Sequence, residues 1–225
     1  HTETRWEFKE KAEKLRVDNK WKVMTNTVQV KRSVGLIVSP KWKLLLQRRS
    51  EDKKENPWMF DKSVWGHTTI MEHYRSKKWL LSNELSDVNM SKEFLEELYI
   101  PTLPISNEFF LDALSSWVDK QWMITKIERI MGYESTRTYE DGSTFIQPYI
   151  SDNYMGYYDW PIQFIDGEAS GIENVSIDVL SGRVEKYADL YTPDLRFMVD
   201  RYRKYLVPIE RFKEVFMENG NTFNV

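Results

Sequence analysis

The chain has 225 residues, enough for one large domain with its own hydrophobic core. Its formal net charge of −3 gives no electrostatic reason to expect nucleic-acid or membrane binding, and the absence of cysteine excludes disulfides, thiolate metal ligands and cysteine nucleophiles. The sequence has no apolar run long enough to span a bilayer and no signal-peptide pattern, so we expect a cytoplasmic protein.

The first part of the chain is typical of a leader followed by a pair of strands. Residues 1–29 are charged and weakly amphipathic, and we expect a partly helical leader there. Residues 31–39 and 41–49 are rich in Val, Ile and Leu and are separated by Ser39-Pro40, which predicts a hairpin. Its core candidates are Leu36, Val38, Leu44 and Leu46. After a polar loop, we expect a backbone turn at Gly66.

Two helices are predicted in the middle of the chain. Residues 91–100 predict a helix. Ser91 is a residue type that caps helix N-termini, and Pro101 ends the helix. Residues 106–119 predict a second helix. Its apolar side comprises Phe110, Leu114, Trp117 and Val118.

The second half of the chain is rich in strands and closes with a helix. Residues 122–139 and 143–151 predict two strands joined through Asp141-Gly142, a strong hairpin signal. Residues 161–166 and 175–180 predict further strands. Thr192-Pro193-Asp194 is a helix start, and apolar residues then recur at helical spacing: Leu195, Met198, Val199, Tyr202 and Leu206. The alternating pattern without a linker indicates a single α/β domain.

Three glutamates crowd one face of the predicted helix at 91–100. At about 100° per residue, Glu93, Glu96 and Glu97 fall within about a 100° arc. Like charges packed this way repel unless something cationic lies over them. Either water and nearby lysines solvate this face, or the face holds a metal ion.

With Gly66 upstream, this helix resembles the signature of the Nudix hydrolase family. That signature is Gly, five residues, Glu, seven residues, then Arg-Glu-apolar-any-Glu-Glu-any-Gly-apolar. Residues 92–100 match its second half, with Lys92 in place of Arg and Tyr99 in place of Gly. The first half is stretched. Glu72 keeps the spacing from Gly66, whereas Glu84 keeps the spacing to Lys92, and we prefer Glu84 because a helix must keep register while a loop can lengthen.

Further segments resemble the branch of this superfamily that includes isopentenyl diphosphate isomerase. These are residues 44–50 (LLLQRRS) with Lys53, Pro57-Trp58, residues 63–67 (SVWGH) and residues 191–196 (YTPDLR). The resemblance implies a Nudix-type α/β/α sandwich with a mixed β-sheet. The domain would cover residues 30–225, with insertions at 73–91 and 101–165.

By this resemblance, the protein is a pyrophosphohydrolase that cleaves a diphosphate linkage in a nucleotide or related small molecule. Mg²⁺ or Mn²⁺ would neutralise the diphosphate, because hard cations prefer carboxylate oxygens. The implied metal ligands are Glu93, Glu96, Glu97 and the Gly66 carbonyl. The general base is one of Glu97, Glu84 and Glu72, with Glu173 a weaker candidate. Arg48, Arg49 and Lys53 would contact the diphosphate. No nucleic-acid partner is implied, and a homodimer is compatible with the sequence.

Two departures from the signature favour an alternative function. The family arginine orients a catalytic glutamate with its two-pronged guanidinium, and Lys92 keeps the charge but loses the fork. Tyr99 replaces a glycine that commonly takes a left-handed conformation after a helix, so we expect a different helix exit. The alternative is a catalytically impaired binding or regulatory protein. An isopentenyl diphosphate isomerase is disfavoured because that family uses a cysteine, which this chain lacks.

The internal histidines and a group of aromatic residues each have a structural and a functional interpretation. His67 and His73 are structural or touch a substrate. Residues 153–161 (NYMGYYDWP) either pack in the core or form a lid. Trp58 and Trp65, like the aromatic residues of this segment, either pack in the core or stack on a nucleobase or line an isoprenoid pocket.

Overall fold

The computed structural model describes residues 30–39, 41–68, 82–114, 122–139, 141–158, 161–163, 167, 169–208, 211–212 and 214–215. The predicted leader at 1–29 therefore lies outside the described residues. So do Glu72, His73, Trp117, Val118 and the side chain of Glu84, whose backbone belongs to a helix.

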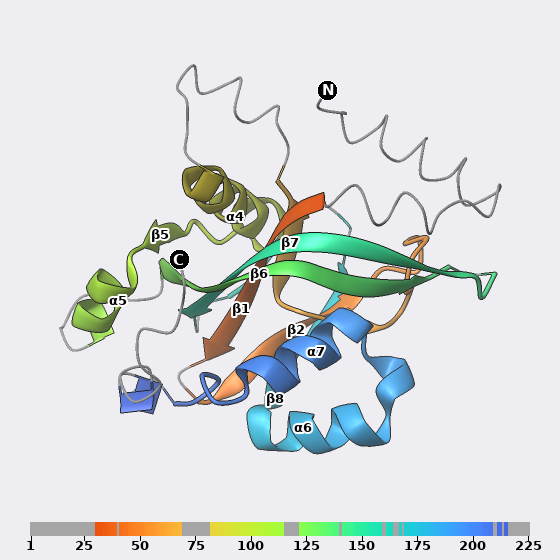
Figure 1. Cartoon of the computed structure of the whole chain (residues 1–225). Coiled ribbons are helices and arrows are strands. Elements are labelled where there is room, and N and C mark those ends of the chain that lie inside the picture. Colours follow the sequence, from red (N-terminus) through yellow and green to blue (C-terminus); the bar gives the residue numbers. More distant parts are fainter. Residues whose placement is uncertain are drawn as a thin grey trace.

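One mixed sheet forms the centre of the molecule, with helices on both faces (Figure 1). The strands are β1 (Val30–Ser39), β2 (Lys43–Arg49), β3 (Phe60–Asp61), β4 (Val64–His67), β5 (Leu103–Ile105), β6 (Met123–Thr138), β7 (Thr144–Tyr157) and β8 (Ala169–Ser176). The helices are α4 (Ser82–Leu98), α5 (Asn107–Leu114), α6 (Ile177–Lys186) and α7 (Pro193–Tyr202), with a short 3₁₀ helix, η1, at Ala188–Leu190.

The sheet order is β3-β2-β1-β7-β6-β5, with β4 paired to β1 and β8 paired to β2. β1 runs parallel to β7 and β5 runs parallel to β6, while the other pairs are antiparallel. The predicted hairpin of β1 and β2 is confirmed, with Val38 opposite Leu44. The β6–β7 hairpin is also confirmed, and Gly142 in its turn has a φ of 77°.

Side chains of β1 alternate between two apolar clusters, as a strand buried on both faces requires. Val34, Leu36 and Val38 pack in the cluster that contains α6 and α7 residues. Ile37 packs in the cluster with Phe94 of α4. All four predicted core residues of the hairpin are buried in the α6–α7 cluster (Leu36, Val38, Leu44 and Leu46). The sheet therefore separates an α4 face from an α6–α7 face.

Helix α4 begins nine residues before the predicted start. It starts at Ser82, so Ser91 lies inside the helix and is not its N-cap; that prediction was wrong. The additional turns are held by polar contacts, because Ser86 donates to the buried carboxylate of Asp152 and its carbonyl accepts from Ser33. Such contacts leave no apolar periodicity in the sequence.

Two other local predictions were wrong. Gly66 lies in strand β4, paired with Ser33, and not in a turn. In the predicted strand at 175–180, β8 ends at Ser176 and helix α6 begins at Ile177. Asp178 in the first turn suits a helix N-terminus, while Ile177 and Leu180 bury one side of the helix. In the predicted strand at 161–166, the described residues 161–163 belong to no strand.

Helix α7 starts as predicted. The Thr192 hydroxyl accepts a hydrogen bond from the Leu195 amide at 3.2 Å, and Pro193 occupies the first helical position. The predicted apolar residues from Leu195 to Leu206 are all buried. None of the helices in the described ranges is long and apolar enough to cross a membrane.

Candidate functional site

Glu93 of α4 lies directly against Gly66 of β4. A β-carbon built at Gly66 would collide with the carboxylate of Glu93, so no residue larger than glycine leaves room for this side chain. The small residue therefore lets an acidic side chain reach the backbone of the strand. This close approach accounts for the glycine at position 66 without a turn.

Glu97 lies one helical turn further and is nearly enclosed, with 4% of its surface exposed. Gln47 Nε2 donates to Glu97 Oε2 at 2.7 Å and to the Ser63 carbonyl at 2.5 Å. Ser63 is itself fixed, because its hydroxyl donates to the Leu45 carbonyl and accepts from the Ile37 amide. Hence α4 places two carboxylates, four residues apart, along the segment 63–66.

The third glutamate is placed differently. Glu96 is 53% exposed and pairs with Lys92 Nζ at 3.0 Å, and the same ammonium lies 3.5 Å from Glu93 Oε1. Lys92 therefore offsets the repulsion between these two acids. The solvated interpretation of the acidic face therefore applies to Glu96, while Glu93 and Glu97 are largely enclosed.

Comparison with known structures identifies the fold around this helix. A NUDIX hydrolase from Alicyclobacillus acidocaldarius has a TM-score of 0.52 and 11% sequence identity, with 77% of this chain and 90% of that chain covered. The DR0079 protein from Deinococcus radiodurans has a TM-score of 0.50 and 18% identity, with 78% and 85% covered. The chain has the Nudix fold. No protein-family model matches the sequence, and no curated protein matches it.

The predicted α/β class and mixed sheet of the Nudix fold are thus confirmed. The similarity does not extend to a particular branch, and the likeness to the isopentenyl diphosphate isomerase branch is not confirmed. At these sequence identities the structures establish the fold alone.

The exit of the Nudix-signature helix does not differ as expected. Tyr99 has a φ of 56°, the left-handed conformation that glycine usually adopts after a helix. The Tyr99 amide donates to the Leu95 carbonyl, and the Ile100 amide donates to the Phe94 carbonyl. The expectation of a different exit was therefore wrong, because Tyr99 adopts the left-handed backbone conformation in place of glycine.

Oxygen donors for a hard cation are present beside β4. The Glu93 carboxylate fills the space that the missing β-carbon at Gly66 leaves beside the strand backbone, and the enclosed Glu97 carboxylate lies one helical turn further on, bonded to Gln47. Across the described ranges, which omit the Glu84 side chain, no group of three or more His, Asp or Glu residues is arranged to hold a metal ion. The donor chemistry thus fits Mg²⁺ or Mn²⁺ with two acids in place, and Glu96 would have to leave Lys92 to join them.

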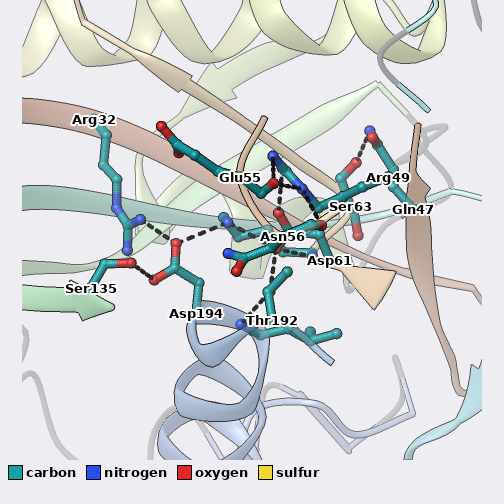
Figure 2. Close-up of polar contacts among 12 residues, drawn as sticks. Arg32, Gln47, Arg49, Glu55, Asn56, Asp61, Ser63, Ser135, Thr192 and Asp194 are labelled. Carbon is teal, nitrogen blue, oxygen red and sulfur yellow. Dashed lines mark hydrogen bonds and ion pairs between the residues drawn. The ribbon is translucent and has the colours of Figure 1, made fainter. Parts of the chain in front are cut away.

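The predicted diphosphate contacts occupy different environments. Arg49 is buried and donates to the carbonyls of Glu55 and Asn56 and to Asp61 (Figure 2). It therefore holds the loop between β2 and β3. Arg48 is exposed, with its guanidinium 5.3 Å from the ring centre of Trp58. Lys53 is half-buried in the same loop.

Of the other candidate bases, the structure places only Glu173 in full. Glu173 pairs with Arg183 at 2.6 Å, and its strand partner Leu46 packs in the α6–α7 cluster. Glu173 therefore lies across the sheet from α4. Glu84 belongs to α4 by its backbone, eight residues before Lys92, and Glu72 is outside the described residues.

The aromatic residues mostly pack in the core. In the predicted lid, Tyr154, Met155, Tyr157 and Tyr158 are buried. His67 is half-buried between the rings of Trp65 and Tyr149. For the described residues, the core interpretation is therefore confirmed over the lid.

Sequence reasoning missed Gln47, which fixes Glu97. The signal was its place in β2, two residues after Leu45 and therefore on the same face of the strand. Leu45 packs in the α4 cluster. A polar residue on the buried face of a strand indicates a polar partner in the core.

Proposed function

We propose that this protein is a divalent-metal-dependent hydrolase that cleaves a diphosphate linkage in a nucleotide or related small molecule. One observation supports the proposal: in a Nudix fold, α4 sets Glu93 against Gly66 and, one turn on, Glu97 against Gln47, which also binds the Ser63 carbonyl. Such a pair of enclosed acids is costly unless cations or hydrogen bonds compensate it.

Each residue then has a stated role in the proposal. Glu93, Glu97 and the Gly66 carbonyl would hold Mg²⁺ or Mn²⁺, with Glu96 completing the set. The metal, when bound, would neutralise the diphosphate and lower the pKa of the attacking water. Gln47 keeps Glu97 in one orientation through its 2.7 Å hydrogen bond. The base that accepts the water proton is Glu97, Glu84 or Glu72.

Arg48 and Lys53 remain the proposed contacts of the diphosphate. Arg48 is exposed at the end of β2, next to Gln47, so its guanidinium is accessible to an anionic group. Arg49, also predicted for this role, would act indirectly by holding the β2–β3 loop that carries Lys53.

The test is hydrolysis of a panel of nucleoside diphosphate compounds in the presence of Mg²⁺, followed by chromatography of the nucleoside monophosphate product. The double variant Glu96→Gln, Glu97→Gln should lose at least about 100-fold in rate, because it removes metal donors and a candidate base. Glu185→Gln is the matched control, since Glu185 is an exposed acid of α6 on the other side of the sheet. Equal rates in the double variant and the wild type would overturn the site assignment.

A specific observation favours the alternative of a binding or regulatory protein that does not turn over. Lys92 pairs with both Glu96 and Glu93. A metal ion that bound these two carboxylates would therefore compete with the Lys92 ammonium for them. If no compound in the panel is hydrolysed to a nucleoside monophosphate while calorimetry shows that the wild type binds one of them, the alternative replaces the hydrolase.

A further inference from the structure

A buried group of charged residues lies on the α6–α7 face of the sheet, away from α4 (Figure 2). We call it the Asp194 cluster. Its members are Arg32 of β1, Arg49 of β2, Asp61 of β3, Lys62 in the turn after β3, Arg137 of β6 and Asp194 of α7. Arg32 occupies the same side of β1 as Val34 and Leu36, which fixes the face on which the cluster lies.

The carboxylate of Asp194 is fully used within the cluster. Its Oδ2 accepts from Arg32 Nη1 at 2.6 Å, Lys62 Nζ at 3.2 Å and Arg137 Nη2 at 3.2 Å. Its Oδ1 accepts from the hydroxyls of Tyr133 at 2.8 Å and Ser135 at 2.6 Å. Three cations therefore share one oxygen atom, which cannot neutralise all of them.

The second carboxylate does not restore the balance. Asp61 accepts from Lys62 Nζ at 3.0 Å and from Arg49 Nη1 at 3.2 Å. The three arginines alone exceed the two carboxylates by one positive charge, and Lys62 adds a second when it is protonated. Glu55 is a further acid beside the cluster, but it is partly exposed and its carboxylate is 4.0 Å from Arg137.

Both acids of the cluster are ionised, and burial lowers the pKa of Lys62, so the excess of positive charge is carried by the three arginines. Burial would raise the pKa of Asp61, but the charges of Lys62 and Arg49 outweigh it and hold that pKa at about 2. Burial acts the same way on Asp194, and Arg32, Lys62 and Arg137 hold its pKa well below the usual range. An excess of buried positive charge destabilises the fold unless an anion offsets it.

Two donors of the cluster have no partner among the residues that the structure describes. They are Arg32 Nη2 and Arg137 Nε, and both side chains are at least 98% buried. The guanidinium carbons of Arg32 and Arg137 lie 4.3 Å and 5.7 Å from the ring centre of Tyr149, so both are beside the same ring. A ring face attracts a cation but accepts no directed hydrogen bond of ordinary strength.

We propose that the Asp194 cluster is a binding site for a small oxyanion, such as a phosphate group. A water molecule could accept one of the free N–H groups, but it is neutral and cannot offset the excess charge. An oxyanion does both, because charge-assisted bonds from guanidinium groups are the strong class of protein hydrogen bonds. Arg32 and Arg137 supply these donors, and Asp194 holds both guanidinium groups in place.

This site is separate from the proposed hydrolase site and does not rest on it. Trp65 and Gly66 are neighbours in β4 but face opposite sides of the sheet. Trp65 contacts Lys62 and Arg137 of the cluster, whereas Gly66 contacts Glu93. Phosphate binding at the cluster should therefore persist in the Glu96→Gln, Glu97→Gln variant, whatever its turnover.

The first experiment measures the melting temperature in inorganic phosphate and in sodium chloride at matched ionic strength. Saturating phosphate should raise the Tm of the wild type by about 5 °C or more over chloride. A titration with ribose 5-phosphate separates the two sources of the phosphate group, which are free phosphate and a phosphorylated small molecule. Tighter binding of ribose 5-phosphate than of inorganic phosphate would show that the ligand is a phosphorylated small molecule. Equal Tm values in phosphate and chloride would overturn the proposal.

The second experiment locates the anion. Arg32→Lys keeps a cation for Asp194 but removes the free Nη2, and it should weaken phosphate binding by about tenfold or more. Arg183→Lys is the matched control, because Arg183 pairs with Glu173 at the surface. This variant should bind phosphate like the wild type. Equal loss in both variants would contradict the assignment.

A third measurement keeps the proposal testable if Arg32→Lys does not fold. Crystals of the wild type soaked in selenate should show an anomalous peak within hydrogen-bond distance of Arg32 Nη2 and Arg137 Nε. A peak only at the surface would mean that the Asp194 cluster binds no oxyanion.

Discussion

Tyr99 shows how a single residue can hold a strained backbone in place of glycine. Its φ of 56° lies in the left-handed region, which costs a residue with a β-carbon roughly 1–2 kcal/mol. The two hydrogen bonds to the carbonyls of Leu95 and Phe94 close the helix in spite of this cost. Since 57% of its side chain is exposed, Tyr99 recovers little of it by burial.

We therefore expect Tyr99→Gly to raise the free energy of unfolding by about 0.5–1 kcal/mol. Relief of the left-handed strain exceeds the extra freedom that glycine gains in the unfolded chain. Urea unfolding followed by circular dichroism measures the change. Tyr187→Gly is the control, because Tyr187 also follows a helix but has an ordinary φ of −129°, so glycine should destabilise the protein there. A loss of stability in both variants would contradict the strain argument.

Helix α4 and strand β4 form the proposed site through one close contact. Gly66 gives the carboxylate of Glu93 its place, so the helix can lie near the strand only while position 66 has no side chain. The same glycine has no conformational need for its residue type, because it lies inside a strand. Its role is in the spacing of the two elements.

We expect Gly66→Ala to lower the rate of diphosphate hydrolysis by about 100-fold, since a shift of about 1 Å in a catalytic group has effects of this size. The added methyl group must push Glu93 away or move α4. Gly171→Ala in β8 is the matched control, because a β-carbon there meets no atom within 4 Å, and its rate should stay within about twofold of the wild type. Circular dichroism of both variants shows whether the fold is kept. Unchanged turnover in Gly66→Ala would exclude Glu93 from the site.

Sequence patterns predicted those elements whose signals are local. The β1–β2 hairpin has alternating apolar residues and a turn between them, and Thr192 caps α7 in the usual way. The start of α4 escaped prediction because its first turns are held by polar contacts. Ser86, for example, meets Asp152, which is 66 residues away in the chain. A pattern of apolar residues cannot reveal an element that polar partners hold.

At the scale of the whole molecule, the Asp194 cluster joins strands and a helix that are distant in the sequence. Arg32 and Asp194 are 162 residues apart, so their pairing could not be predicted without the fold. The sequence held one sign of a buried partner for Arg32: it lies on the same face of β1 as Val34 and Leu36, which are buried. The acid at position 194 has an ordinary explanation as a helix-start residue, which concealed its role in the core.

The same cluster makes the stability of the fold depend on acid pH. Asp61 has a pKa of about 2 in the folded protein, against about 3.9 in an unfolded chain. A carboxyl group with a lowered folded pKa stabilises the protein above the unfolded value, and this contribution is lost as the pH falls toward the folded one. The loss for Asp61 is about 2 kcal/mol, spread between about pH 4 and pH 2.

Asp61→Asn should remove this part of the pH dependence, because asparagine does not titrate. Its free energy of unfolding is expected to be lower than that of the wild type at neutral pH, since Lys62 and Arg49 lose a partner, and the difference should shrink by about 1 kcal/mol between about pH 5 and pH 3. Urea unfolding at several pH values measures this. Asp52→Asn is the control, since Asp52 is exposed in the β2–β3 loop and should follow the wild-type curve. A constant difference between Asp61→Asn and the wild type at every pH would mean that Asp61 titrates normally and that the cluster does not hold its charge.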